Sequence, residues 1–542
     1  NEFYTVNLFS DYSRQLGDHY FKVMGGFNAE HQNVRTLSAQ RDGIIVPDLP
    51  TIDTSTEQDV AGGGYNHWAT AGFFGRLNYN YKEKYLLEVN GRYDGTSRFM
   101  KDQRWNFFPS FSLGWNVARE NFWKPLESVV NQFKLRGSWG ELGNQNTSNL
   151  YPFYEILPVK SNSGNWLVNG GKTNTADIPS LVSTLLTWER VRSFNVGFDF
   201  GAFSNRLTGS FDYFVRKTVD MVGPAPQLPL VLGIAPAIVN NADMKSYGFE
   251  IELSWRDRIG EVDYGVKFNL ADAQQKVVKY PNTTNAFSDW YAGKMSGEIW
   301  GYTSLGIAKT DEEMKEHLAS LPNGGQNQLG NKWGAGDIMY ADINGDGKVD
   351  GGKGTLADPG DQRIIGNSTP RYNFGLVLDA SYKGFDVSIF FQGVGKRDYA
   401  PIVGTNGAVF WGAVNNIWQS MAMEEHFDYF RPEGHPMGAN LNGYYPRPDF
   451  TSNKNHQVQT RYLQDASYIR LKNLQIGYTL PKQWINKLHI NRCRVYVSGD
   501  NLWTGTSLAS MFDPETLAAG DWGSGKTYPL SKVISFGLNV NF

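Results

Sequence analysis

Residues 534–542 read Ile-Ser-Phe-Gly-Leu-Asn-Val-Asn-Phe, an alternation of apolar with small or polar residues. The same alternation recurs in 85–94, in 193–200 and in 247–255. Successive side chains of a β-strand point to opposite faces, so a period of two predicts strands with one apolar face. A soluble sandwich, in which the apolar face is the core, fits this pattern as well as a membrane barrel does.

Composition narrows the class of protein. The 542 residues contain 51 Lys and Arg against 54 Asp and Glu, so a nucleic-acid partner bound through bulk positive charge is excluded. Hydrophobic residues reach 40%, but no apolar run approaches the roughly 18–20 residues of a membrane-spanning helix. A transmembrane β-barrel remains open, because its lipid-facing residues alternate with polar ones. The single cysteine, Cys493, cannot form an internal disulfide.

The alternation predicts about fifteen strands. Short connections alternate with long ones, and the longest are expected over 143–188, 279–370 and 398–465, with short helix-like patches at 311–321 and 413–427. The expected strands are 2–14, 18–31, 67–82, 84–97, 105–119, 130–142, 189–202, 206–219, 244–257, 262–278, 371–383, 385–397, 466–480, 492–504 and 533–542.

This alternation of connection lengths predicts an all-β fold, a large antiparallel transmembrane β-barrel with short periplasmic turns and long extracellular loops. Soluble domains rarely contain several loops of this length. Bacterial single-chain barrels have even strand numbers, and counting back from a periplasmic C-terminus makes the first strand run inward. We therefore expect residues 1–542 to be the C-terminal portion of a barrel whose first strands lie outside this chain. A count that is wrong by one strand is the alternative.

Several motifs in family order resemble the SusC/RagA family of TonB-dependent outer-membrane transporters. They span nearly the whole chain, and the terminal Phe542 also resembles the signal that the outer-membrane assembly machinery reads. The motifs are Phe107-Phe-Pro-Ser-Phe-Ser-Leu-Gly-Trp-Asn-Val-Ala-Arg-Glu-Asn-Phe-Trp123, Phe133-Lys-Leu-Arg-Gly-Ser-Trp-Gly140, Lys245-Ser-Tyr-Gly-Phe-Glu250, Asp342-Ile-Asn-Gly-Asp-Gly347, Ala466-Ser-Tyr-Ile-Arg-Leu-Lys-Asn-Leu-Gln-Ile-Gly-Tyr-Thr-Leu-Pro481 and Val497-Ser-Gly-Asp-Asn-Leu502.

The resemblance implies a barrel of about 22 strands with a plug domain. This chain would supply about fifteen of those strands and would not supply the plug. It implies energy-coupled import of a bulky nutrient, with an oligosaccharide as the first candidate cargo, and no enzymatic activity. A SusD-like surface lipoprotein would act as a lid, and the TonB complex would act through the missing N-terminal region. Polar side chains such as Glu88, Arg92, Glu250 and Glu252 would line the lumen. The alternatives are a peptide importer of the same fold, a passive barrel or adhesin, and a soluble carbohydrate-binding sandwich.

One motif matches a calcium-binding loop. Asp342, Asn344, Asp346 and Asp350 occupy positions 1, 3, 5 and 9, and a glycine occupies position 6. Oxygen ligands at alternate positions around a sharp turn suit Ca²⁺. The twelfth position is Lys353 in place of the usual Glu, so Asp358 or Asp361 would have to substitute. We expect a structural Ca²⁺ site at most, and the alternative is a turn held by Asx hydrogen bonds.

Aromatic residues in the expected loops are candidate ligand-binding residues. Flat rings stack on apolar sugar faces, and neighbouring amides and carboxylates bond the hydroxyl groups. Interfacial girdle rings and loop packing are the competing interpretations. The candidates are Trp290, Trp300, Trp333, Trp411 and Trp418.

A formal P-loop match over 520–527 precedes a strand and not a helix, so nucleotide binding is not expected. The chain has neither a G-x-S-x-G nor an H-E-x-x-H motif. The sequence therefore predicts no catalytic residues and no required cofactor.

Overall fold

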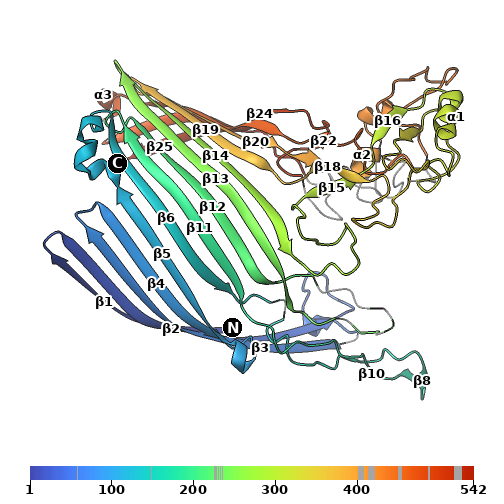
Figure 1. Cartoon of the computed structure of the whole chain (residues 1–542), viewed down its shortest axis with the longest axis horizontal. Coiled ribbons are helices and arrows are strands. Elements are labelled where there is room, and N and C mark those ends of the chain that lie inside the picture. The colour runs from blue at the N-terminus through green and yellow to red at the C-terminus, as the bar shows by residue number, and fades with distance from the viewer. Residues whose placement is uncertain are drawn as a thin grey trace.

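The computed structural model describes residues 1–542 except 58, 148, 225–228, 230, 232, 235, 401–407, 413–421, 450–453, 486–488 and 518–527. Fifteen long strands form one sheet (Figure 1). They are β1 (Glu2–Leu16), β2 (His19–Arg41), β3 (Asp59–Tyr81), β4 (Tyr85–Thr96), β5 (Trp105–Asn116), β6 (Val130–Asn144), β11 (Glu189–Ala202), β12 (Leu207–Val222), β13 (Asn240–Ile259), β14 (Val262–Lys279), β19 (Arg371–Tyr382), β20 (Phe385–Lys396), β23 (Tyr468–Thr479), β24 (Arg492–Thr506) and β25 (Val533–Asn541).

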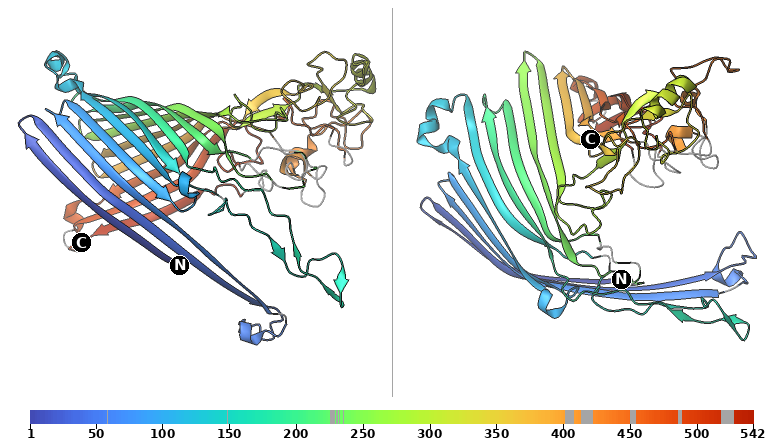
Figure 2. Two further views of the ribbon diagram at one scale, coloured as in Figure 1. Left: turned by 60° about the horizontal axis from the view of Figure 1, so that its bottom comes forward. Right: turned by 45° about the vertical axis from the view of Figure 1, so that its right-hand side comes forward.

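These strands form a simple meander. Each long strand pairs antiparallel with the long strand before it, from β1 at one edge to β25 at the other. Figure 2 shows the sheet curving strongly along its width. All fifteen strands expected from the alternation are present, which confirms the all-β class and the antiparallel order.

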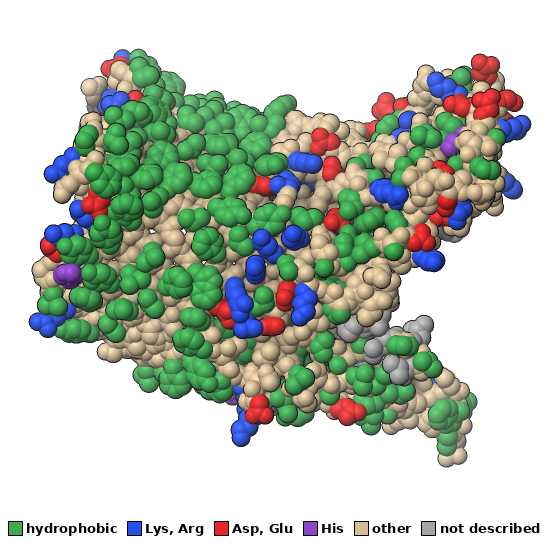
Figure 3. Space-filling view, viewed as in Figure 1, with side chains coloured by type: hydrophobic (Ala, Val, Ile, Leu, Met, Phe, Trp, Pro, Cys, Tyr) green, Lys and Arg blue, Asp and Glu red, His purple; other side chains and the backbone are tan. Residues whose placement is uncertain are grey.

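The register separates the strand residues onto two faces. Phe194 pairs with Trp139 of β6 and with Val215 of β12, so all three lie on one face. This face leaves large apolar side chains exposed, with Phe194 at 47% and Val196 at 44%. In Figure 3 such side chains form a broad apolar area over the strands. A wall with an apolar outer surface is the arrangement that a lipid bilayer requires.

The connections at one rim are short. Gly17, Gly260 and Gly384 have positive φ in three of these turns, a conformation that glycine adopts without steric cost. Two longer connections on this rim contain 3₁₀ turns over Val117–Arg119 and Asn121–Leu126, and the short helix α3 (Lys482–Ile485). Glu120 lies between those 3₁₀ turns.

Glu120 ties this rim together. Its carboxylate accepts hydrogen bonds from Tyr85 at 2.7 Å, from Lys84 at 2.9 Å and from Trp115 at 3.2 Å. These bonds, the one from Tyr85 first, lower the pKa of Glu120 to about 2. The carboxylate therefore stays ionised and holds the β4–β5 end of the rim to the following connection.

One expected loop is replaced by a hairpin. The expected strands 18–31 and 67–82 leave 32–66 between them as a loop. In the structure β2 continues to Arg41 and β3 begins at Asp59, with Arg41 opposite Asp59. This extension of the β2–β3 hairpin contains the run Gly62–Gly64 and polar residues on both faces. Its sequence therefore lacks the apolar alternation from which strands were predicted. Both sides of this extension are solvated, and the backbone ladder alone sustains the pairing. The 3₁₀ turn Ile52–Thr54 lies within its tip.

The long connections lie at the opposite rim. Those over 280–370, 397–467 and 507–532 gather beyond the ends of β14 to β24, at the right of Figure 1, and their described residues are called the loop unit below. Its elements are β15 (Glu298–Gly301), β16 (Ser304–Ile307), α1 (Asp311–Ala319), β17 (Ile338–Tyr340), β18 (Arg363–Asn367), β21 (Asp398–Tyr399), α2 (Ala408–Trp411), a 3₁₀ turn (Glu424–Phe427) and β22 (Gln464–Asp465).

The remaining elements are small. A separate connection over 145–188 carries two two-stranded ladders, and a 3₁₀ turn over Lys101–Gln103 joins β4 to β5. The ladders pair β7 (Val159–Lys160) with β10 (Thr175–Ala176) and β8 (Leu167–Val168) with β9 (Gly171–Lys172). Among the described residues, no helix has the length and apolar character needed to cross a membrane.

Candidate functional site: the loop unit and the inner wall

The loop unit has its own hydrophobic interior. It contains residues from all three connections, so residues as far apart in the sequence as Tyr302 and Phe512 pack in one cluster. Aromatic rings dominate, and Trp411 contacts Tyr462 edge-to-face with the ring centroids 4.9 Å apart. The buried members are Tyr302, Leu321, Ile338, Tyr340, Val349, Tyr399, Phe410, Trp411, Tyr445, Tyr462, Ala466, Leu508 and Phe512.

A buried carboxylate organises the polar part of this interior. Asp337 is 0% exposed and accepts hydrogen bonds from the Lys454 ammonium at 2.8 Å and from Asn455 at 2.9 Å. The Arg447 guanidinium adds two more bonds, at 2.8 and 2.6 Å. A buried charge persists only when it is paired and fully hydrogen-bonded. Asp337 therefore joins the connection over 280–370 to the one over 397–467.

Two buried amides extend this network along β17. Gln326 donates to the Ile338 carbonyl at 2.8 Å and accepts from the Tyr340 N–H at 3.0 Å, as a neighbouring strand would. The Asn455 carbonyl oxygen accepts from the Ile338 N–H at 3.0 Å. Because these side chains satisfy backbone groups that would otherwise be buried without partners, the short strand persists far from the main sheet.

A second charged network joins the loop unit to the wall. Arg470 of β23 contacts Asp513 and Glu515 of the connection over 507–532, each at 2.7 Å. Lys472, two residues along the same strand, contacts the other Glu515 oxygen at 2.6 Å. The sequence interpretation missed this network, because the residues are about 43 positions apart and no local pattern connects them.

A recess opens on the loop unit. It has a volume of about 170 Å³ and is lined by Trp411, His426, Tyr429, Tyr445 and His456 among others. This is below the roughly 300–1,000 Å³ of typical small-molecule pockets, so it has room for one ring and not for an oligomer. Burial lowers the pKa of His456 to about 4 and keeps this imidazole neutral at physiological pH.

The structure brings only two of the candidate tryptophans into the same cluster. Trp411 is 3% exposed in the interior of the loop unit, and Trp333 packs against that interior beneath the Lys454 ammonium. Only the edge of Trp411 that lines the recess could contact a ligand. Trp300 stacks on Phe287 at 4.5 Å between centroids. The half-buried ring of Trp290 packs on Tyr280, and Trp418 lies outside the described residues.

The calcium-like loop is closed by hydrogen bonds to its own backbone. The two Asp342 oxygens accept from the Gly345 and Gly347 N–H groups at 2.7 and 2.8 Å. Asn344 accepts from the Asp346 N–H at 3.0 Å, and Gly347 has a φ of +81°. These bonds are those of an Asx-bonded turn.

The segment after this turn folds back as the calcium interpretation required. Asp361 accepts from the Asp350 N–H at 2.8 Å, while the Asp350 carboxylate contacts Lys348 at 2.5 Å. Over the described residues, no group of three or more His, Cys, Asp or Glu side chains is arranged to share a metal ion. Calcium binding stays a prediction. The P-loop match over 520–527 lies outside the described residues.

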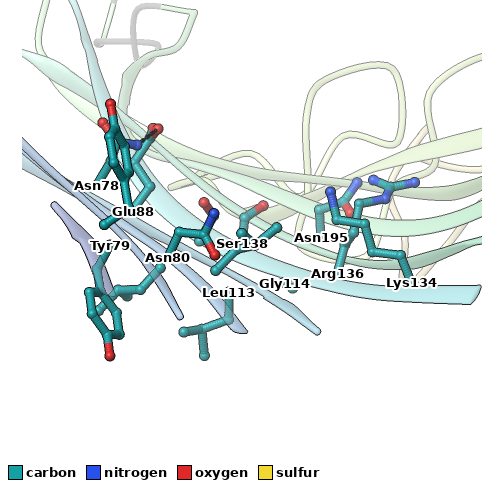
Figure 4. Close-up of a pocket in the computed structure, with 15 residues that line it drawn as sticks. Asn78, Tyr79, Asn80, Glu88, Leu113, Gly114, Lys134, Arg136, Ser138 and Asn195 are labelled. Carbon is teal, nitrogen blue, oxygen red and sulfur yellow. Dashed lines mark hydrogen bonds between the residues drawn. The ribbon is translucent and has the colours of Figure 1, made fainter. Parts of the chain in front are cut away.

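The face of the sheet opposite the apolar one is polar. Figure 4 shows Asn80, Glu88 and Ser138 on the concave side of the wall, while Tyr79 and Leu113 point to the other side. Two hollows of about 440 and 550 Å³ lie along this wall, and the second includes Glu252.

Some of the charged groups on this inner wall are paired or hydrogen-bonded. Arg136 of β6 contacts Asp199 of β11 and Asp212 of β12, each at 2.8 Å. Glu88 accepts from the Asn78 and Asn90 amides at 2.6 and 2.9 Å. The wall therefore offers amides, hydroxyls and charged groups that can hydrogen-bond a hydrophilic solute.

The curved sheet, its apolar outer face, its polar inner face and the long connections on one rim define the wall of an outer-membrane β-barrel. The chain belongs to the family described as TonB dependent receptor-like, beta-barrel, whose model matches residues 1–502. This membership confirms the outer-membrane location and the resemblance seen in the sequence motifs.

Three known proteins illustrate the relationship. The chain is 28% identical to TonB-dependent receptor P3 of Formosa agariphila, over 99% of this chain and 52% of that protein. It is 24% identical to TonB-dependent receptor SusC of Bacteroides thetaiotaomicron, over 99% and 50%. A solved structure of the RagAB peptide transporter superposes with a TM-score of 0.77 at 21% identity, over 99% of this chain and 55% of that one. The chain spans about half the length of the curated relatives it matches.

Proposed function

We propose that this chain forms the wall and the surface loops of a TonB-dependent importer that takes up a bulky hydrophilic nutrient. The main support for this proposal is that the same sheet has a polar inner face and a folded loop unit at one rim. A solute captured at the loops would meet Asn78, Asn80, Ser138 and Asn195 on its way along the wall. The wall would do no bond chemistry, in keeping with relatives that are named receptors and transporters.

An oligosaccharide is the cargo we propose. Amides and hydroxyls on the wall can replace the water around sugar hydroxyls without introducing net charge, and the relative from Bacteroides thetaiotaomicron is a SusC protein. A SusD-like lipoprotein would bind over the loop unit, because the packed interior of this unit would support a binding surface for it. The TonB complex would act through a plug domain that relatives twice this length have room to contain.

The two free edges of the sheet indicate that additional strands are needed to close the barrel. β1 and β25 are the two edges of the fifteen-stranded sheet as described, and Phe3, Leu8 and Phe9 of β1 are exposed. A free strand edge inside a bilayer leaves backbone groups without partners, so membrane barrels are closed. We propose that further strands complete the barrel between these two edges.

The test begins with native mass spectrometry of the complex extracted in detergent from outer membranes. We expect a membrane-bound assembly with a surface lipoprotein and an oligosaccharide. Uptake of that oligosaccharide, labelled, should stop when the gene is deleted and when a protonophore collapses the energy supply. Recovery of peptides would overturn the sugar assignment and keep the importer. Solubility without detergent, or uptake that needs no energy, would overturn the importer.

A further inference from the structure

Four basic side chains form a row across the outer face of the wall. Arg192 of β11 lies opposite Lys217 of β12, Lys217 lies opposite Lys245 of β13, and Lys245 lies opposite Lys276 of β14. Directly opposed residues of neighbouring strands share a face, so all four project from the same side of the sheet. With strands about 4.8 Å apart, the row is roughly 14 Å long.

On three of its four strands the row borders the apolar surface of the barrel. Two residues further toward the membrane, the same four strands carry Phe194, Val215, Tyr247 and Gln274. Two residues of a strand are roughly 7 Å, so the basic groups lie just outside the aromatic edge of the lipid-facing band. Figure 3 shows a group of Lys and Arg side chains, with Asp and Glu side chains among them, beside the apolar area of the sheet. The row lies near the strand ends that lead to the long connections, at the extracellular rim.

Most of the positive charge in the row is uncompensated. Arg192 contacts Glu141 at 2.7 Å, and the neighbouring Arg190 contacts Asp220 at 2.5 Å. Within the described part of the chain, no carboxylate lies within 4.0 Å of the ammonium groups of Lys217, Lys245 and Lys276. The Lys245 ammonium instead lies 5.1 Å from the centre of the Tyr247 ring.

Like charges placed directly opposite each other on a sheet are destabilising. Two successive lysine pairs, Lys217 with Lys245 and Lys245 with Lys276, therefore repel each other, and none of the three ammonium groups is neutralised by an ion pair within the described wall. An anion at this level would relieve the repulsion. The row lies at the boundary between the lipid-facing band and the headgroup layer. An anion that fits this position is therefore one attached to an acyl chain.

We propose that Lys217, Lys245 and Lys276, flanked by Arg192, bind the phosphate of a phosphorylated glycolipid of the outer leaflet, of the lipid A type. The ammonium groups would hold the phosphate as point charges. The acyl chains would lie on the apolar band below, against Phe194 and Val215. This site faces the bilayer and is separate from the cargo path along the inner wall.

The test compares lipid retention by two variants of the complete protein assembled in outer membranes. The first is K217Q/K245Q/K276Q, and the second is K309Q/K315Q/K353Q, which removes the same charge from exposed positions of the loop unit. A basic residue near a charged membrane surface contributes roughly a fivefold preference, so three contribute on the order of a hundredfold. We expect at least a tenfold loss of bound lipid A by native mass spectrometry in the first variant and none in the second.

Three further arms identify the ligand. Lipid A stripped of phosphate should bind the wild-type protein at least tenfold more weakly, and raising NaCl from about 0.05 to 0.5 M should release lipid A because exposed charges are then screened. Inorganic phosphate alone should not raise the thermal stability. Equal retention by the two variants, equal binding of the stripped lipid, or stabilisation by inorganic phosphate equal to that by lipid A would overturn the proposal. The salt arm needs no variant, so it decides even if K217Q/K245Q/K276Q fails to assemble.

Discussion

Arg470 of β23 and Asp513 of the connection over 507–532 lie 2.7 Å apart, with side chains only 4% and 7% exposed. This pair is a direct charged link between the membrane wall and the loop unit. Burial alone would raise the pKa of Asp513, but a backbone N–H from Glu515 and the guanidinium outweigh it and lower that pKa. The Asp513 carboxylate therefore stays charged at neutral pH.

Replacing Arg470 should loosen the loop unit. R470M leaves the buried Asp513 carboxylate without its guanidinium, while Glu515 keeps Lys472. Breaking a buried pair costs about 3–5 kcal/mol. We expect faster proteolysis within 507–517 and a lower unfolding temperature. The control is R258M at the opposite rim, because Arg258 pairs with Asp263 at 3.6 Å in an exposed position and such pairs contribute about 0–1 kcal/mol. Equal effects of the two changes would show that the link is not structural.

His456 should make the loop unit sensitive to acid. Its pKa is about 4 in the folded chain because of burial, against about 6.5 unfolded, so the unfolded chain binds more protons between these values. The free energy of unfolding then falls as pH falls from about 6.5 to 4, by about 3 kcal/mol in total. H456F should reduce the dependence of the unfolding temperature on pH. The control H489F, at an exposed position, should leave that dependence unchanged. An unchanged slope in H456F would contradict the assignment.

The two faces of β11 should respond oppositely to a new charge. V196R places a guanidinium on the lipid-facing side and should cost about 2–4 kcal/mol near the middle of the bilayer. N195R, one residue away, points to the inner wall and should be tolerated. Yield of heat-resistant barrel in outer membranes measures both. Equal yields would show that Val196 does not face lipid.

The calcium prediction can be decided at the loop after β17. Bound Ca²⁺ at a hundredfold excess over its dissociation constant should add about 2.7 kcal/mol to the stability of the folded loop unit. We expect calcium to raise the unfolding temperature of the wild-type protein and not that of D342N/D346N. No response to calcium or to a chelator would assign Asp342 and Asp346 to the Asx-bonded turn alone.

Much of the fold could be read from local pattern. The period-two alternation in 193–200 and 247–255 predicted β11 and β13, and connection lengths predicted which rim carries the loops. The extension of the β2–β3 hairpin near Gly62 was not predicted, because a strand solvated on both sides has no apolar alternation. Of the candidate site, the sequence could indicate aromatic loops but not that Trp411 would be buried, since burial depends on which distant segments pack over a ring.

Local residue pattern specifies the antiparallel wall and its two faces, because strand geometry converts a spacing of two residues directly into a side of the sheet. Only the tertiary structure decided the relations between distant residues. The contact of Arg470 with Asp513, the bonds from Arg447, Lys454 and Asn455 to Asp337, and the alignment of the three lysines all depend on register and loop packing. A shift of one residue in the register would have sent those lysines to the other face.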